Sequence, residues 1–238
     1  MDQLKQGSKD IAQSDRLAVL ANATADAKAL IHGCEHKTRN GARTDVPLDQ
    51  VDRIMASGPA AARMGVQRMV RPYGPPNGGT PTRLSWFDRG PWKRIQITSD
   101  EVVYRFPTPH ADFLTRYIDD EVPLDKLGEL GRYDGSCLID RTMGEAAARC
   151  DSEAANILTR NLMHDIVCGA RTVEEAFSFY SETLSAYCLG EAAPYCEQFQ
   201  FEVPCGSSGD PDEPVSPGPK AKQIAEKVDE FLAAAGRS

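Results

Sequence analysis

Hydrophobic residues recur along this chain with two different periods. Near the N-terminus and in the last third they return every three or four residues, the spacing of one helix face. In the middle of the chain they alternate with polar residues, which is typical of strands with one buried face. The pattern predicts helices over residues 14–32, 47–57 and 59–70, and strands over residues 83–87, 92–98, 101–106, 136–139 and 197–203.

The clearest helices are two consecutive ones within residues 151–189. The first ends at Gly169. The second begins at Thr172, because Thr172 and Glu175 have the capping-box spacing, in which each side chain accepts a hydrogen bond from the other residue's backbone. Since the link between the two helices is only a few residues long, we expect an antiparallel helical hairpin.

A further helix is predicted to begin at Thr108-Pro109, because proline fits the first helical position. This helix would stop near Pro123 and would place His110 in its first turn, where the helix dipole disfavours a charged imidazole. A short helix is expected to follow and to end at Gly131.

The alternation of helical and strand-like segments favours the α+β class. We expect an antiparallel sheet of about four strands, packed against several helices that include the hairpin. A single globular domain would span residues 10–204, with a helical part at 10–72 and a sheet-containing part at 83–204. Residues 205–219 predict a flexible linker, because they are rich in Gly, Ser, Pro and Asp. Residues 220–236 predict a C-terminal amphipathic helix with an apolar stripe of Ile224, Val228, Phe231, Leu232 and Ala235.

The formal net charge of -8 is that of a soluble acidic protein and argues against general nucleic-acid binding. The charge is uneven, since residues 1–99 carry +6 and residues 100–204 carry -12, so the second half could meet a basic partner or a cation.

No apolar run approaches the roughly 20 residues of a transmembrane helix. Because no signal peptide is visible, the cytoplasm is the default location, and export is expected only if a signal was removed.

Polar residues interrupt the apolar face of the first hairpin helix. On a helical wheel, Asn161 and Asp165 fall inside the apolar arc, and His164 lies at its edge. A buried amide and carboxylate are costly unless they are hydrogen-bonded. We therefore expect either a structural polar network or a catalytic Asp/His site on the 151–168 helix. The polar residues on the opposite arc are Ser152, Glu153, Asn156, Thr159 and Arg160.

The densest group of metal-ligand residue types lies at the end of the first predicted helix. His32 and His36 could share a helix face, as metal-binding pairs do. Gly33 is expected to end that helix, so a solvated loop is the competing interpretation. No particular cofactor is indicated.

The seven cysteines include no CxxC pair, which argues against a zinc ribbon or a thioredoxin-type site. The hairpin would bring Cys150 beside Cys188, where a disulfide is possible, and Cys188 with Cys196 is the competing pair. Ser136 and Cys137 follow Asp134 closely, but a turn before a strand is the favoured interpretation, because no nucleophile elbow surrounds Ser136.

Three functions follow from these features. The first is a non-enzymatic interaction or assembly protein that binds a protein partner, or itself, through residues 220–236. The second is a small-molecule hydrolase or lyase that uses Asp165, His164 and Asn161. The third is a metal-binding protein that uses His32 and His36. We favour the first because the sequence carries no catalytic motif.

Overall fold

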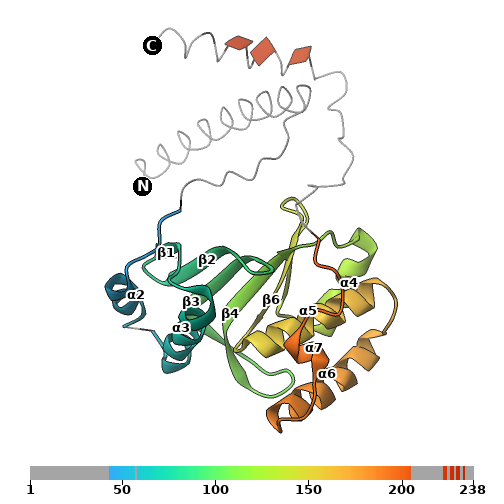
Figure 1. Ribbon diagram of the computed structural model, residues 1–238. Helices are drawn as coiled ribbons and strands as arrows, with labels where there is room; N and C mark the ends of the chain where they lie inside the picture. The colour runs from blue at the N-terminus through green and yellow to red at the C-terminus, as the bar shows by residue number, and fades with distance from the viewer. Residues whose placement is uncertain are drawn as a thin grey trace, which may run out of the picture. The chain divides into compact units, whose positions relative to one another are not determined.

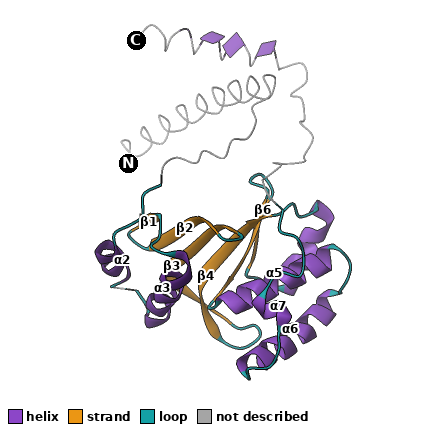
Figure 2. Ribbon diagram, in the orientation of Figure 1, coloured by secondary structure: helices purple, strands orange, loops and turns teal. Residues whose placement is uncertain are grey.

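The computed structural model describes residues 43–56 and 58–204, together with residues 222, 223, 226, 227, 229, 230 and 233. Residues 40–211 make up one compact unit. Its elements, in chain order, are α2 (Leu48–Met55), α3 (Ala60–Tyr73), β1 (Gly78–Thr80), β2 (Arg83–Arg89), β3 (Trp92–Tyr104), β4 (His110–Asp119), the 3-10 helix η1 (Leu124–Lys126), α4 (Leu127–Tyr133), β5 (Cys137–Asp140), β6 (Glu145–Cys150), α5 (Glu153–Val167), α6 (Val173–Cys188) and α7 (Pro194–Glu197). The predicted α+β class is confirmed (Figure 2).

The sheet is larger than the four strands we expected. It has six antiparallel strands in the order β1-β2-β3-β4-β6-β5. Two of the predicted strands are one long strand, β3, whose register with β4 shifts between Ile97 and Val102. Two strands escaped prediction because their composition hides them: β1 is a glycine pair with a threonine, and β6 is centred on alanines, which usually favour helices.

Strand β4 replaces the helix that we predicted from Thr108 onward, so that prediction is wrong. The strand pairs with β3 on one side and with β6 on the other. Residues 112–116 are all buried. Because the side chains on both faces of this stretch are buried, apolar residues do not alternate with polar ones, and their spacing resembles that of a helix.

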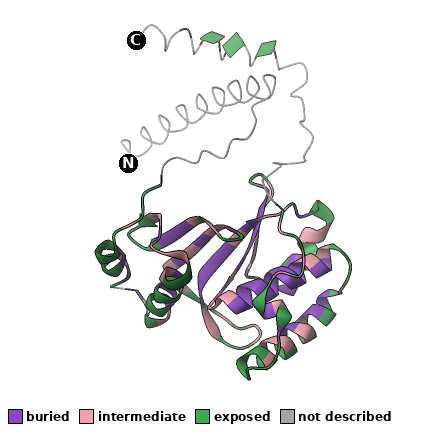
Figure 3. Ribbon diagram, in the orientation of Figure 1, coloured by how far each residue is buried: buried purple, intermediate pink, exposed green. Residues whose placement is uncertain are grey.

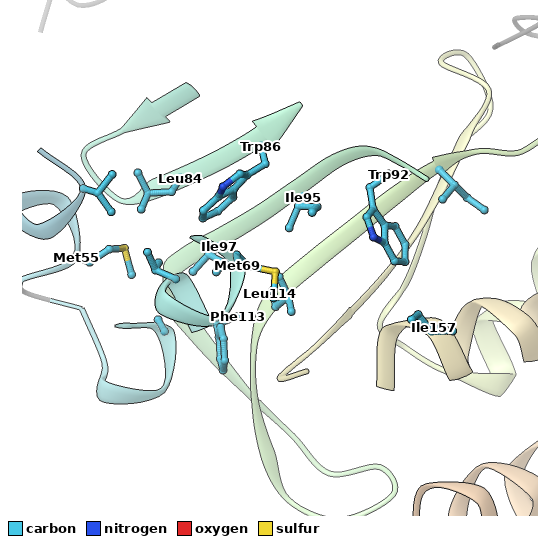
Figure 4. Close-up of a cluster of buried hydrophobic side chains, with 14 residues drawn as sticks. Met55, Met69, Leu84, Trp86, Trp92, Ile95, Ile97, Phe113, Leu114 and Ile157 are labelled. Atoms are coloured by element: carbon cyan, nitrogen blue, oxygen red, sulfur yellow. The ribbon is translucent and has the colours of Figure 1, made fainter. Parts of the chain in front are cut away.

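Helices α3 and α5 cover the same face of the sheet (Figure 1). The side chain of Arg116 on β4 is in contact with both helices, because it lies against Met69 of α3 and Glu153 of α5. Between the sheet and these helices lies a cluster of buried apolar side chains (Figure 4), among them Met55, Met69, Leu84, Trp86, Trp92, Ile95, Ile97, Phe113, Leu114 and Ile157. A second cluster packs α5 against α4 and α6, and it includes Leu130, Tyr133, Leu158, Leu162, Ile166, Val173 and Tyr180.

Helix α5 is buried on nearly all sides, which corrects our helical-wheel prediction that one of its faces is polar and exposed. We placed Asn156, Thr159 and Arg160 opposite the apolar arc, but each is at most 2% exposed. Figure 3 shows that most of α5 is buried. The helix packs against the sheet on one side and against α6 and α7 on others, so little of its surface faces water. The polar groups find partners in this layer: Asn156 Nδ2 donates to the Leu114 carbonyl at 3.1 Å, and the Arg160 guanidinium pairs with Asp120.

Both helices predicted within residues 151–189 form, and they pack against each other. The Ser152 hydroxyl caps the start of α5 by accepting a hydrogen bond from the backbone of Ala155. The capping box of Thr172 and Glu175 is confirmed at the start of α6. Gly169 has a φ of +72°, a conformation that suits glycine just beyond a helix end.

The strand predicted over residues 197–203 does not form. Residues 194–197 form the short helix α7, and the backbone that follows joins no sheet. Burial along this stretch still alternates, since Phe199, Phe201 and Val203 pack partly buried against the first apolar cluster. The backbone here is bound instead by the side chain of Asn161, which accepts a hydrogen bond from the Gln200 amide.

Several predicted features lie outside the described residues, namely the helix at 14–32, His32, His36 and the linker at 205–219. The seven described positions between 222 and 233 are helical and exposed. None of the helices in the described parts of the chain is long and apolar enough to cross a membrane.

Candidate metal centre

Asn161, the first of the predicted site residues, is buried and holds the chain segment after α7. Its Nδ2 donates to the carbonyl oxygens of Tyr195 and Gln198, each at 2.9 Å. Its Oδ1 accepts from the backbone amide of Gln200 at 2.8 Å. Every polar group of the Asn161 amide is therefore used by the protein itself.

Asp165 and His164 point to different neighbours. Asp165 Oδ2 accepts from Arg171 Nε at 2.8 Å and from the Tyr195 hydroxyl at 3.1 Å. His164 stacks on Phe201, with ring centroids 4.2 Å apart. The three residues thus share one face of α5, but each has its own protein partners. A catalytic role for them stays a prediction.

A different cluster of chemically active side chains forms where β4 and β6 end. His110 and Asp112 are two residues apart on β4, so they project to the same face of the sheet. Cys150 ends β6 opposite Leu114, and this register places its side chain on that face as well. Strand pairing therefore brings Cys150 next to His110 and Asp112, although Cys150 lies 40 positions after His110 in the sequence.

The three donor atoms of this cluster lie within 4.8 Å of one another. His110 Nε2 is 3.0 Å from Asp112 Oδ1 and 3.4 Å from Cys150 Sγ. The side chain of Asp112 is 1% exposed and that of His110 is 14% exposed, so only the histidine edge reaches solvent. Donor atoms bound to one zinc ion stand roughly 3–4 Å apart, because each bond is about 2.0–2.3 Å long.

The protonation state of His110 follows from the partner of its Nδ1 atom. Nδ1 lies 2.8 Å from the carbonyl oxygen of Thr108, which can only accept, so Nδ1 carries a proton. In the neutral ring, Nε2 would then present its lone pair to the Asp112 carboxylate. A positive charge must relieve that repulsion. Without a metal ion the charge is a second proton, and the carboxylate of Asp112 and the thiol of Cys150 raise the pKa of His110 to about 11.

Asp112 presents one oxygen without a hydrogen bond. Ser136 Oγ donates to Oδ2 at 2.7 Å, whereas Oδ1 is buried and accepts no hydrogen bond from the described residues. The short distance from Oδ1 to His110 Nε2 is that of an ion pair, without the alignment of a hydrogen bond. A buried carboxylate oxygen of this kind costs free energy unless a cation meets it. Without a metal ion that cation is the charged His110 ring, and a bound metal ion would take the place of its Nε2 proton.

The surroundings of the cluster hold its members in place. The Ser136 backbone amide donates to Asp134 Oδ1 at 2.7 Å, which fixes the turn that carries the Ser136 hydroxyl. Burial raises the pKa of Asp134 to about 6. The Tyr104 ring stands edge-on to the His110 imidazole, with centroids 5.9 Å apart. His110 and Asp112 thus each have an outer partner, as metal ligands in proteins usually do.

Sequence reasoning missed this cluster for one reason. Had residues 110–119 been predicted as a strand, the His-x-Asp spacing would have placed both side chains on one face. Cys150 was expected beside Cys188, but its thiol lies against His110 and contacts Tyr180. All five cysteines in the described part of the chain are free.

Comparison with known proteins gives no match from which a function could be inferred. No protein-family model matches the chain, and no curated protein or solved structure is significantly similar to it. The function must therefore be inferred from the geometry of the chain itself.

Proposed function

We propose that this protein binds one divalent transition-metal ion through His110 Nε2, Asp112 Oδ1 and Cys150 Sγ. The grouping of three different metal-ligand atoms within 4.8 Å of one another, with Asp112 Oδ1 buried and used by no hydrogen bond, is the observation that carries this proposal. The proposal keeps the metal-binding function expected from the sequence, but moves it from His32 and His36 to a different set of residues.

The donor set favours zinc or cobalt over calcium or magnesium. One imidazole, one thiolate and one carboxylate form a borderline-soft set, whereas calcium and magnesium prefer oxygen ligands only. Three protein ligands leave a fourth position of a tetrahedral ion free for water or a small molecule. Binding a metal would release the Cys150 proton and the second proton of His110, so affinity should rise with pH.

The full-length protein should take up one zinc ion per chain, and cobalt should give the absorption of a tetrahedral thiolate complex. His110→Gln removes one of three ligands, so affinity should fall by more than the roughly 10–100-fold typical of losing an outer partner. Titration calorimetry with zinc chloride measures the change. His164→Gln, which alters a histidine of α5, is the matched control and should bind zinc like the wild type.

A second variant separates this proposal from the site expected from the sequence. Replacing both His32 and His36 by glutamine should leave zinc binding unchanged. Loss of binding in that double variant, with binding retained in His110→Gln, would assign the metal to the N-terminal pair. A wild-type protein without stoichiometric metal would reject both sites.

We also propose, as a second function, self-association through the helix at 220–236. The described positions of this helix are exposed, and Lys227 pairs with Glu230 along its surface at 2.8 Å. An amphipathic helix with a solvated polar side needs a partner for its apolar stripe. Truncation after Pro219 should reduce an oligomer to a monomer in light scattering. An unchanged mass per particle would contradict this second function.

A further inference from the structure

Cys168 and His164 form a thiol–imidazole pair at the end of α5. Cys168 is the C-cap residue of this helix and is exposed. Its Sγ lies 3.4 Å from Nε2 of His164, which is one helical turn earlier. The imidazole ring is held by Phe201, since the two rings are nearly parallel, with an interplanar angle of 6°. A nucleophile, a base and a group that orients the base are thus in contact.

The other described cysteines lack this combination. Burial raises the pKa of the thiols of Cys137, Cys150 and Cys196, which keeps them protonated and less reactive. Cys188 is exposed, but the residue one turn earlier is Leu184. Within the described residues, Cys168 alone is both exposed and paired with an imidazole.

We propose that Cys168 is a nucleophilic thiol activated by His164, and that this pair is the site at which the protein reacts with small uncharged electrophiles. In the reaction, the imidazole nitrogen takes the thiol proton as the sulfur attacks the electrophilic carbon. A sulfur–carbon bond forms, the bond from that carbon to the leaving group breaks, and the leaving group departs as an anion. The proton on His164 then passes to solvent, so no oxidant or reductant is needed.

The position of the pair explains the preference for an uncharged reagent. Cys168 follows the last turn of a 15-residue helix, where the unpaired carbonyl groups create a partial negative charge. This charge opposes the approach of an anionic reagent, so an uncharged electrophile is the reagent that this position favours. The imidazole beside the sulfur supplies the base for the reaction.

Cys188 provides a matched internal control. It is exposed like Cys168, and it is the last residue of α6, so the dipole of its helix acts on it in the same direction. The full-length protein is treated with limiting iodoacetamide at pH 7, and alkylation at each cysteine is followed by peptide mass spectrometry. Cys168 should react roughly ten-fold faster than Cys188, a conservative value for assistance by a general base.

Two variants test the role of the imidazole. His164→Gln should slow Cys168 to the rate of Cys188. Phe201→Leu keeps the imidazole but removes the stacked ring, and should give an intermediate rate, so the pair remains testable if the first variant does not fold. Equal rates for Cys168 and Cys188 in the wild type, or a Cys168 rate that His164→Gln leaves unchanged, would overturn the proposal. His110→Gln should not alter the Cys168 rate, which separates this site from the proposed metal centre.

Discussion

Asn161→Leu is expected to lower the free energy of unfolding by about 3 kcal/mol, because it removes three hydrogen bonds and leaves their backbone partners unpaired. Leucine keeps the branched heavy-atom skeleton of asparagine but can neither donate nor accept a hydrogen bond at this 1%-exposed position. The loss should therefore come from the segment after α7, whose backbone has no strand to pair with. Urea unfolding measures the change in stability, and hydrogen exchange at the Gln200 amide reports on the segment itself.

A substitution on the same segment separates backbone from side chain. Gln198→Ala keeps the carbonyl that Asn161 binds and changes only an exposed side chain, so its stability should stay within about 0.5 kcal/mol of the wild type. If Asn161→Leu is as stable as this control, and the Gln200 amide stays protected, the amide of Asn161 is not what holds the segment.

Glu153→Leu should cost about 3 kcal/mol, because it leaves a buried guanidinium without its carboxylate. Arg116 is fully buried and lies over the Trp92 ring, 4.6 Å from its centroid. Glu153 also accepts from the Tyr73 hydroxyl at 2.7 Å, so one carboxylate joins α3, β4 and α5. This expected loss of stability stands at the lower end of the range for breaking a buried ion pair. The Glu153 side chain is 36% exposed, so water can partly replace the carboxylate beside Arg116.

The matched test for this pair is a double-mutant cycle. Arg116→Met with Glu153→Leu removes both charges, and should be more stable than the sum of the single losses implies. Asp49→Leu breaks an ion pair with Arg53 that is exposed on both sides, so its cost should stay below about 1 kcal/mol. Equal costs for Glu153→Leu and Asp49→Leu would mean that burial of Arg116 does not matter.

Sequence patterns identified the elements that carry their own local signals. The capping box at Thr172 and the alternation of residues 92–98 depend on neighbouring residues only, and both are found in the structure. The burial of Asn161 and Asp165 was also predicted correctly from the wheel. A helical wheel assumes that one face of the helix is exposed to solvent, and α5 has almost no such face.

The features that escaped prediction depend on contacts between distant residues. Whether residues 110–119 form a helix or a central strand is decided by β3 and β6 on either side, which the local sequence does not contain. The cluster of His110, Asp112 and Cys150 follows from that pairing, so missing the strand meant missing the candidate metal centre. Residues 198–203 have the alternation of a strand, but Asn161 holds their backbone in place of a neighbouring strand.

The alanines of β6 set a volume limit on the layer above them. Ala146 and Ala148 are fully buried, and β6 packs against α5. Only small side chains therefore fit between this strand and the helix. In homologous sequences we therefore expect compensating changes of size: a bulkier residue at position 146 or 148 should occur together with a smaller residue on the facing side of α5.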